Sequence, residues 1–119
     1  MTAFPKHQYV RSNKLMAAYR MIPCQHCGAF DGTVCGAHAN SGAQHKGMGI
    51  KADDNACASL CHTCHMKLDQ GKELTEIERK VMWGKAQAKT FRELLARGLW
   101  PVNVPFPNID VRYLDTYQP

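Results

Sequence analysis

Two stretches decide the fold, CQHC at 24–27 and CHTC at 61–64, each a pair of cysteines separated by two residues. Two such pairs can supply four thiolates to a tetrahedral zinc ion, whereas one pair alone would be weak evidence. We expect all six cysteines to be reduced thiols, because the N-terminal residues carry no secretory signal. The spacing therefore predicts a structural zinc site with four ligands, Cys24, Cys27, Cys61 and Cys64. The remaining two, Cys35 and Cys57, are expected to be small buried residues.

The composition describes one ordinary globular chain with a basic bias. The 119 residues are 45% hydrophobic and 21% charged, which excludes a wholly disordered protein. No apolar run is long enough to cross a membrane. The net charge is +5, and no acidic residue precedes Asp31. This bias favours a polyanionic partner. The lack of a secretory signal and of a membrane-spanning run leads us to expect a cytoplasmic protein.

Local signals predict the secondary structure around the two cysteine pairs. Ser12 is a candidate N-cap for a short helix that ends near Met21. Residues 33–39 and 55–60 read as two short strands, joined by a glycine-rich loop. A helix is expected over His62–Gln70, with Gly71 after its end.

A long helix is predicted from a capping box at Thr75 and Glu78 to Gly98. Six small or apolar residues recur at alternating steps of four and three, and we expect this stripe to face the core: Ile77, Val81, Gly84, Ala88, Phe91 and Leu95. The proline-containing tail that follows should be extended and docked.

These signals together predict an α+β fold in a single domain, residues 1–119. A basic arm with a short helix occupies 1–23, the zinc-containing core 24–71, the long helix 72–98 and the extended tail 99–119.

The residues enclosed by the cysteine pairs form a recognisable chemical arrangement. His38 stands at the end of the first predicted strand, and His65 follows Cys64 directly. Asp69 lies four residues after His65, so both side chains share one helix face. A histidine and a carboxylate in that spacing can hold a divalent cation and leave coordination sites open. His38, arriving from the strand, is expected to face the same cation and to act as a general base.

The sequence here resembles the HNH endonucleases, the ββα-metal or His-Me finger group, and most closely the small enzymes of lambdoid phages and prophages. Four blocks carry the resemblance: IPCQHCG (22–28), GAHANSG (36–42), HKGMGIKADD (45–54) and SLCHTCHMKLDQG (59–71). It implies a zinc-stapled ββα-metal core with flanking helices that hydrolyses DNA phosphodiester bonds with Mg²⁺ or another divalent ion. By position, His38 matches the general base, His65 a metal ligand, and Asp69 a second helical ligand.

The chain departs from the family pattern in two places. Many members carry an acidic metal ligand just before the catalytic histidine, where this chain has Ala37. The middle residue of the motif, which tethers the loop holding the base, corresponds best to Asn55, with Asn40 and Asp54 as rivals.

DNA is the partner that these features imply, with recombination or replication proteins as further candidates and no membrane. The resemblance implies a phage or prophage protein in the bacterial cytosol whose products carry 5′-phosphate and 3′-hydroxyl ends. Phosphate contacts are predicted for six residues: Lys14, His45, Lys46, Lys51, Lys85 and Lys89. Two alternatives stay open, a non-catalytic zinc module that binds DNA or a recombination protein, and an enzyme acting on RNA or branched substrates.

Overall fold

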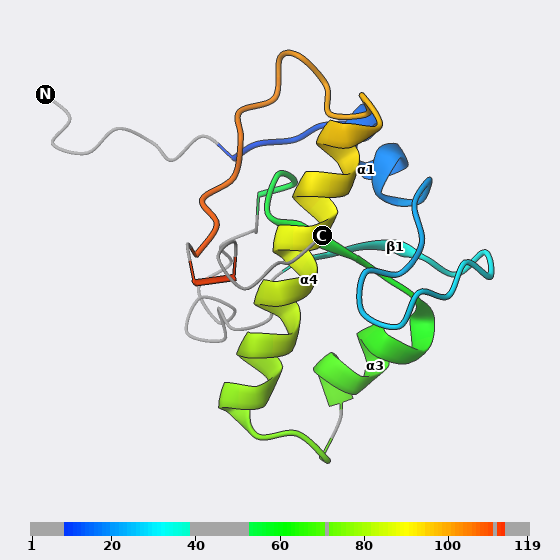
Figure 1. Cartoon of the computed structure of the whole chain (residues 1–119), viewed down its shortest axis with the longest axis vertical. Helices are drawn as coiled ribbons and strands as arrows, with labels where there is room; N and C mark the ends of the chain where they lie inside the picture. The colour runs from blue at the N-terminus through cyan, green and yellow to red at the C-terminus, as the bar shows by residue number, and fades with distance from the viewer. Residues whose placement is uncertain (1–8, 39–52, 71, 111, 114–119) are drawn as a thin grey trace, which may run out of the picture.

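The structure is a computed structural model that describes residues 9–38, 53–70, 72–110 and 112–113. Its elements run α1 (Asn13–Tyr19), β1 (Cys35–His38), β2 (Cys57–Leu60), α3 (His62–Gln70) and α4 (Glu76–Ala96). The strands pair antiparallel, with Cys35 opposite Leu60 and His38 opposite Cys57. In Figure 1, α1 lies near the C-terminal end of α4, α3 lies near its N-terminal half, and β1 runs between them. The α+β class and the order of the predicted elements are confirmed.

The predicted helix starts are confirmed in their hydrogen bonds. The Ser12 hydroxyl accepts from the Leu15 N–H at 3.0 Å, which caps α1. At α4, the Thr75 hydroxyl accepts from the Glu78 N–H, and the Glu78 carboxylate accepts from the Thr75 N–H. Each cap satisfies backbone donors that the first helical turn leaves open, at about 1 kcal/mol per cap.

The two faces of the β1–β2 sheet are covered by different parts of the chain. Successive side chains of a strand point to opposite faces, and directly paired residues share a face. One face belongs to a core shared with α3, α4 and the cysteine pairs, and contributes Ala37, Ala58 and Leu60. The other face contributes Cys57 to a core shared with α1, the end of α4 and the tail. On this second face a Cβ added to Gly36 would lie 2.6 Å from the Tyr19 ring, so only glycine lets α1 pack this closely.

The buried face of α4 differs from the predicted apolar stripe. The prediction is wrong at both ends of the stripe, because Ile77 is 74% exposed and Leu95 is 42% exposed. The face that packs against the sheet is instead Met82, Ala86, Thr90 and Leu94, all buried and spaced by four. Thr90 makes that contact specific, because its hydroxyl accepts the Ser59 N–H at 2.9 Å and donates to the Ala86 carbonyl at 2.7 Å.

The tail covers the middle of the predicted stripe, so α4 is buried on two sides. Phe91 makes edge-on contacts with Trp100 and Phe106, each with ring centroids 5.1 Å apart. A Cβ on Gly84 would lie 2.3 Å from the ring of Tyr113. The prediction of a docked tail is therefore confirmed for its described residues, and Figure 1 shows this segment returning alongside α4.

Candidate functional site

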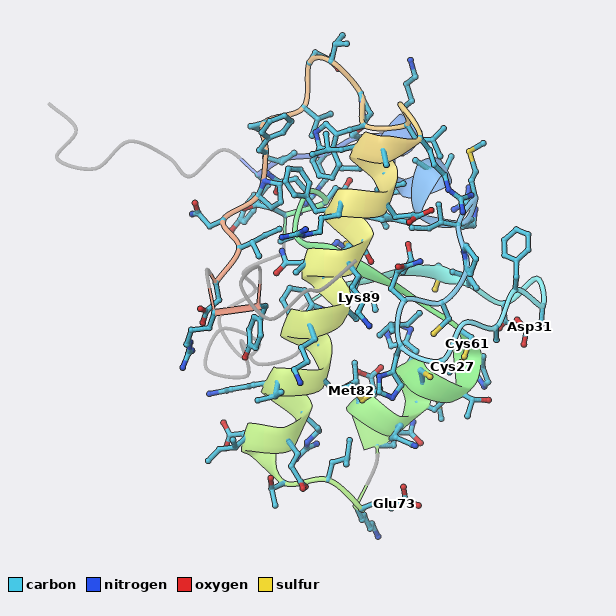
Figure 2. All side chains as sticks on the ribbon, viewed as in Figure 1. Cys27, Asp31, Cys61, Glu73, Met82 and Lys89 are labelled. Atoms are coloured by element: carbon cyan, nitrogen blue, oxygen red, sulfur yellow. The ribbon has the colours of Figure 1, made fainter. Side chains whose placement is uncertain are left out.

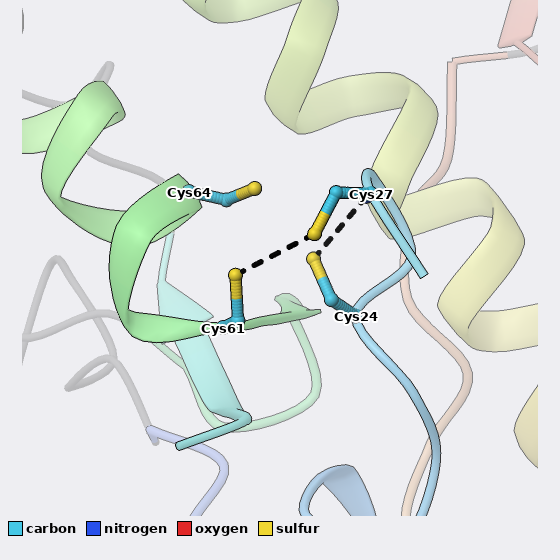
Figure 3. A group of neighbouring side chains, drawn as sticks. All are labelled: Cys24, Cys27, Cys61 and Cys64. Atoms are coloured by element: carbon cyan, nitrogen blue, oxygen red, sulfur yellow. Dashed lines mark hydrogen bonds between the residues drawn. The ribbon is translucent and has the colours of Figure 1, made fainter. Parts of the chain in front are cut away.

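The four predicted zinc ligands lie together. The Sγ atoms of Cys24, Cys27, Cys61 and Cys64 are all within 4.8 Å of one another, and those of Cys27 and Cys61 are 3.6 Å apart. A tetrahedral zinc ion with Zn–S bonds of about 2.3 Å requires sulfur atoms roughly 3.8 Å apart. Figure 3 shows the four sulfur atoms converging on one point, two from the turn at 24–27 and two from the end of β2 and the start of α3. The residues therefore fit a structural metal such as zinc.

The first cysteine pair sits on a tight turn whose backbone suits thiolate ligands. Gly28 adopts φ +83°, which side chains disfavour, and its N–H donates to the Cys24 carbonyl at 2.9 Å. The N–H groups of His26 and Cys27 lie 3.5 and 3.4 Å from the Cys24 sulfur. Burial opposes ionisation of Cys24, but the surrounding backbone N–H groups lower its pKa to about 7. The thiolate form of Cys24 is thus stabilised, whereas burial raises the pKa of a second ligand, Cys64.

His38 ends β1 and contacts a carboxylate. Its Nε2 lies 3.3 Å from Asp54 Oδ1, and the exposed fractions of the two side chains are 36% and 12%. Asp54 also accepts the Ser12 N–H at 2.8 Å through Oδ2, and Arg11 Nη1 lies 3.7 Å from Oδ1. The Tyr19 hydroxyl donates to the Asp54 carbonyl at 2.7 Å, so this residue is held from several directions. A half-exposed imidazole is thereby oriented by a nearly buried carboxylate.

The side chain of Asn55, the first choice for the middle residue of the motif, contacts the tail. Its side-chain amide donates to the Pro105 carbonyl at 3.0 Å and so ties the loop before β2 to the tail. Asp54, one of the two rivals, makes the contact with His38. The other rival, Asn40, lies outside the described residues.

His65 and Asp69 form a second pair, on α3. The sequence spacing places them on one face as predicted, and Nε2 lies 3.4 Å from Oδ2. Cys35 was expected to be buried, but it is only half-buried, and its sulfur lies 4.0 Å from the other ring nitrogen of His65. Cys57 is buried as predicted, and burial raises the pKa of its thiol to about 12.

The His38–Asp54 and His65–Asp69 pairs lie on opposite sides of the sheet. Cys35 and Ala37 point toward α3 and its core, whereas Gly36 and His38 point toward α1. Among residues 9–38, 53–70, 72–110 and 112–113, the four cysteines are the one group of three or more ligand residues whose ligand atoms gather closely enough to hold a metal. The structure thus brings each pair together but does not join His38 to the predicted cation ligands.

Two lysines, Lys67 of α3 and Lys89 of α4, lie close enough to His26 in the first cysteine pair to affect its charge. Lys85 and Lys89 are exposed on α4, and Lys14 is exposed on α1. Partial burial, and then the charges of Lys67 and Lys89, lower the pKa of His26. Figure 2 shows Lys89 on the side of α4 nearest Cys27 and Cys61. The remaining predicted phosphate contacts, His45, Lys46 and Lys51, fall outside the described residues.

Asp54 and Arg11 are the site residues to which sequence reasoning gave too little weight. A usable signal was present, because two adjacent carboxylates, Asp53 and Asp54, stand just before β2, on the loop expected to hold the base. No sequence pattern predicts that residues 10–12 pack onto that loop.

Comparisons with protein-family models, with curated proteins and with solved structures find no match to the chain. In the described part of the chain, no helix combines the length and apolar character that crossing a bilayer requires.

Proposed function

We propose that the chain is a metal-dependent endonuclease of HNH type that hydrolyses DNA phosphodiester bonds. The observation that carries the proposal is the pairing of His38 with the nearly buried Asp54, at the end of the first of two antiparallel strands. The order strand, strand and helix supports it, as does a helix that begins at the second cysteine pair. A purely structural module has no evident need for an oriented, half-exposed imidazole.

The Asp54 contact assigns the two ring nitrogens of His38. A carboxylate accepts hydrogen bonds, so the Nε2 proton points at Asp54 and Nδ1 carries the lone pair. In the proposed reaction Nδ1 takes a proton from water as the water oxygen attacks phosphorus. The P–O3′ bond then breaks, leaving a 5′-phosphate, and the leaving O3′ takes a proton from solvent water to become a hydroxyl. Asp54 holds the ring in position and stabilises the imidazolium that forms.

His65 and Asp69 are the residues proposed to hold the divalent cation. Two ligand atoms on one Mg²⁺, each about 2.1 Å from it, stand roughly 3 Å apart in octahedral geometry. The 3.4 Å between His65 Nε2 and Asp69 Oδ2 fits that requirement after a small adjustment. In the structure this pair and His38 lie on opposite faces of the sheet, so a bound cation would neutralise charge on the phosphate and the leaving oxygen only if DNA binding brings the two pairs together. The four-cysteine site would stabilise the fold by fixing the start of α3, the helix that carries both His65 and Asp69.

DNA is proposed to lie across the exposed lysines of α4 and the N-terminal segment. Lys85 and Lys89 belong to no ion pair among the described residues, so their charge is available to phosphates. Such contacts make affinity salt-dependent and largely independent of sequence. A cytosolic location and recombination or replication proteins as further partners belong to the same proposal.

A non-catalytic zinc module that binds DNA is the second candidate. The observation that favours it is the separation of the two histidine pairs across the sheet, together with Ala37 at the position of the acidic ligand. This candidate predicts binding without cleavage under any metal condition.

Supercoiled plasmid incubated with the zinc-loaded protein distinguishes the two candidates. We expect nicked or linear DNA when Mg²⁺ or Mn²⁺ is added to the zinc-loaded protein, and none when neither ion is added. Asp69→Ala should lose most activity and regain part of it at excess Mn²⁺. The exposed Glu73, which follows α3, offers Glu73→Ala as a matched removal of one carboxylate without loss of activity. DNA that is bound but never cut, with either ion, would establish the module.

A further inference from the structure

Arg11 lies beside His38 because both side chains converge on one carboxylate oxygen. Asp54 Oδ1 is 3.3 Å from His38 Nε2 and 3.7 Å from Arg11 Nη1. Arg11 is 43% exposed and His38 is 36% exposed, whereas Asp54 beneath them is 12% exposed. A guanidinium and an imidazole therefore stand next to each other at the surface, over a common anchor.

The backbone that carries Arg11 is fixed to the loop before β2. The Val10 N–H donates to Asp53 Oδ1 at 2.9 Å, and the Asp54 N–H donates to the Val10 carbonyl at 2.9 Å. The Ser12 N–H donates to Asp54 Oδ2 at 2.8 Å. Residues 10 and 12 are thus pinned on both sides of Arg11, and the side chain between them points to the surface.

The guanidinium itself is also held in place. Nη1 donates to the Val10 carbonyl at 2.9 Å, and the group lies 5.1 Å from the centre of the Tyr9 ring. Arginine carries five N–H donors in a rigid fork that matches the oxygens of a phosphate. A guanidinium already oriented on folding loses less conformational entropy when it binds an anion.

We propose that Arg11 and His38 form one phosphate-binding site, in which Arg11 grips the non-bridging oxygens of the phosphodiester that His38 attacks through water. The inference rests on the proposed function for its substrate, DNA, and adds the residue that places the phosphate against the base. Arg11 places a positive charge 3.7 Å from the carboxylate oxygen that His38 contacts. It would also stabilise the negative charge that grows on those oxygens in the transition state.

Inorganic phosphate, titrated at constant pH and followed by NMR, tests the site without relying on cleavage. The Arg11 Nε–H and His38 ring signals should move along one saturation curve in the wild type. Arg11→Ala should abolish the His38 response, whereas Arg20→Ala, which removes the same charge from the exposed C-cap of α1, should leave it unchanged. Unmoved signals in the wild type, or an undiminished His38 response in Arg11→Ala, would overturn the site.

Single-turnover cleavage of plasmid supplies the second arm. Arg11→Ala should slow the reaction at saturating DNA about 100-fold, as loss of one transition-state donor does. Arg11→Lys keeps the charge without the fork, so it should fold as the wild type does and cleave at an intermediate rate. Wild-type cleavage rates in both variants would refute the role of Arg11. A wild-type protein that never cleaves DNA would refute the proposed function but not the phosphate site, because the phosphate titration tests that site without cleavage.

Discussion

Replacing Asp54 is the perturbation that bears on both the fold and the chemistry. Asp54→Ala removes the acceptor of the Ser12 N–H, the anchor of His38 and the partner of Arg11. Asp54→Asn keeps one acceptor oxygen for Ser12, but it can turn an amide N–H toward His38 Nε2. That N–H would favour the ring tautomer whose lone pair is on the wrong nitrogen. The two variants therefore separate lost stability from lost orientation.

The magnitude follows from the three contacts. A hydrogen bond to a charged group contributes about 1.5–3 kcal/mol, and the short, shielded Ser12 contact should lie within that range. The longer His38 contact and the half-exposed Arg11 pair add about 1 kcal/mol together. Asp54→Ala should thus cost roughly 3 kcal/mol, which lowers the melting temperature by about 12 °C at about 4 °C per kcal/mol for a chain of this size. Asp54→Asn should cost about half as much.

Thermal unfolding and single-turnover plasmid cleavage are the assays. Both variants should cleave about 10- to 100-fold more slowly at a temperature where each is folded, as loss of an orienting partner typically does. Asp53→Asn is the matched control, because its carboxylate accepts the Val10 N–H at 2.9 Å in the same loop. It should lose some stability with the charge, but its amide oxygen can still accept the Val10 N–H and keep Arg11 in place, so the cleavage rate should not change. An Asp54→Asn protein that cleaves as fast as Asp53→Asn would refute the assignment of Asp54.

Three further predictions concern the metal site, the DNA surface and the sheet. Cys61→Ser should lose the bound zinc and unfold, because metal binding and folding are coupled in such small sites; an unchanged melting temperature and zinc content would contradict this. Lys85→Ala with Lys89→Ala should reduce the salt slope of DNA binding by about two counterions without altering stability, and an unaltered slope would show that α4 faces away from DNA. Gly36→Ala should lower the free energy of unfolding, measured by chemical denaturation, by about 1–3 kcal/mol. The new methyl group would collide with the buried Tyr19 ring, whose hydroxyl is held by the Asp54 carbonyl. An unchanged free energy of unfolding would mean that the ring can move.

The parts of the structure that were predictable from sequence depend on neighbours along the chain. Both helix caps, the Gly28 turn and the limits of α3 follow from residues within a few positions of one another. The two cysteine pairs are a stronger signal, because only a shared metal explains both spacings in one short chain. The sequence therefore predicts that the two pairs lie together in the fold, although 33 residues separate them and the course of those residues was not known.

Features that depend on packing between distant segments were not predictable. The α4 stripe was misjudged because the sheet contacts small and polar residues such as Ala86 and Thr90, while the tail covers Phe91. Asn55 and Asp54 are adjacent, and only the docking of residues 10–12 turns Asp54 toward His38. Strand alternation did contain one unused signal, because the buried Ala37 implies that its neighbour His38 points to the opposite face.

The most direct test of the proposed chemistry is the single-turnover cleavage rate of His38→Ala, measured at saturating DNA. The protein should keep its zinc, its melting temperature within about 4 °C, the equivalent of about 1 kcal/mol, and its DNA affinity without added Mg²⁺, since His38 is assigned proton transfer and not binding. The rate should fall by about a hundredfold to ten-thousandfold, and excess Mn²⁺ should not restore it. A His38→Ala protein that cleaves DNA at the wild-type rate would contradict the account.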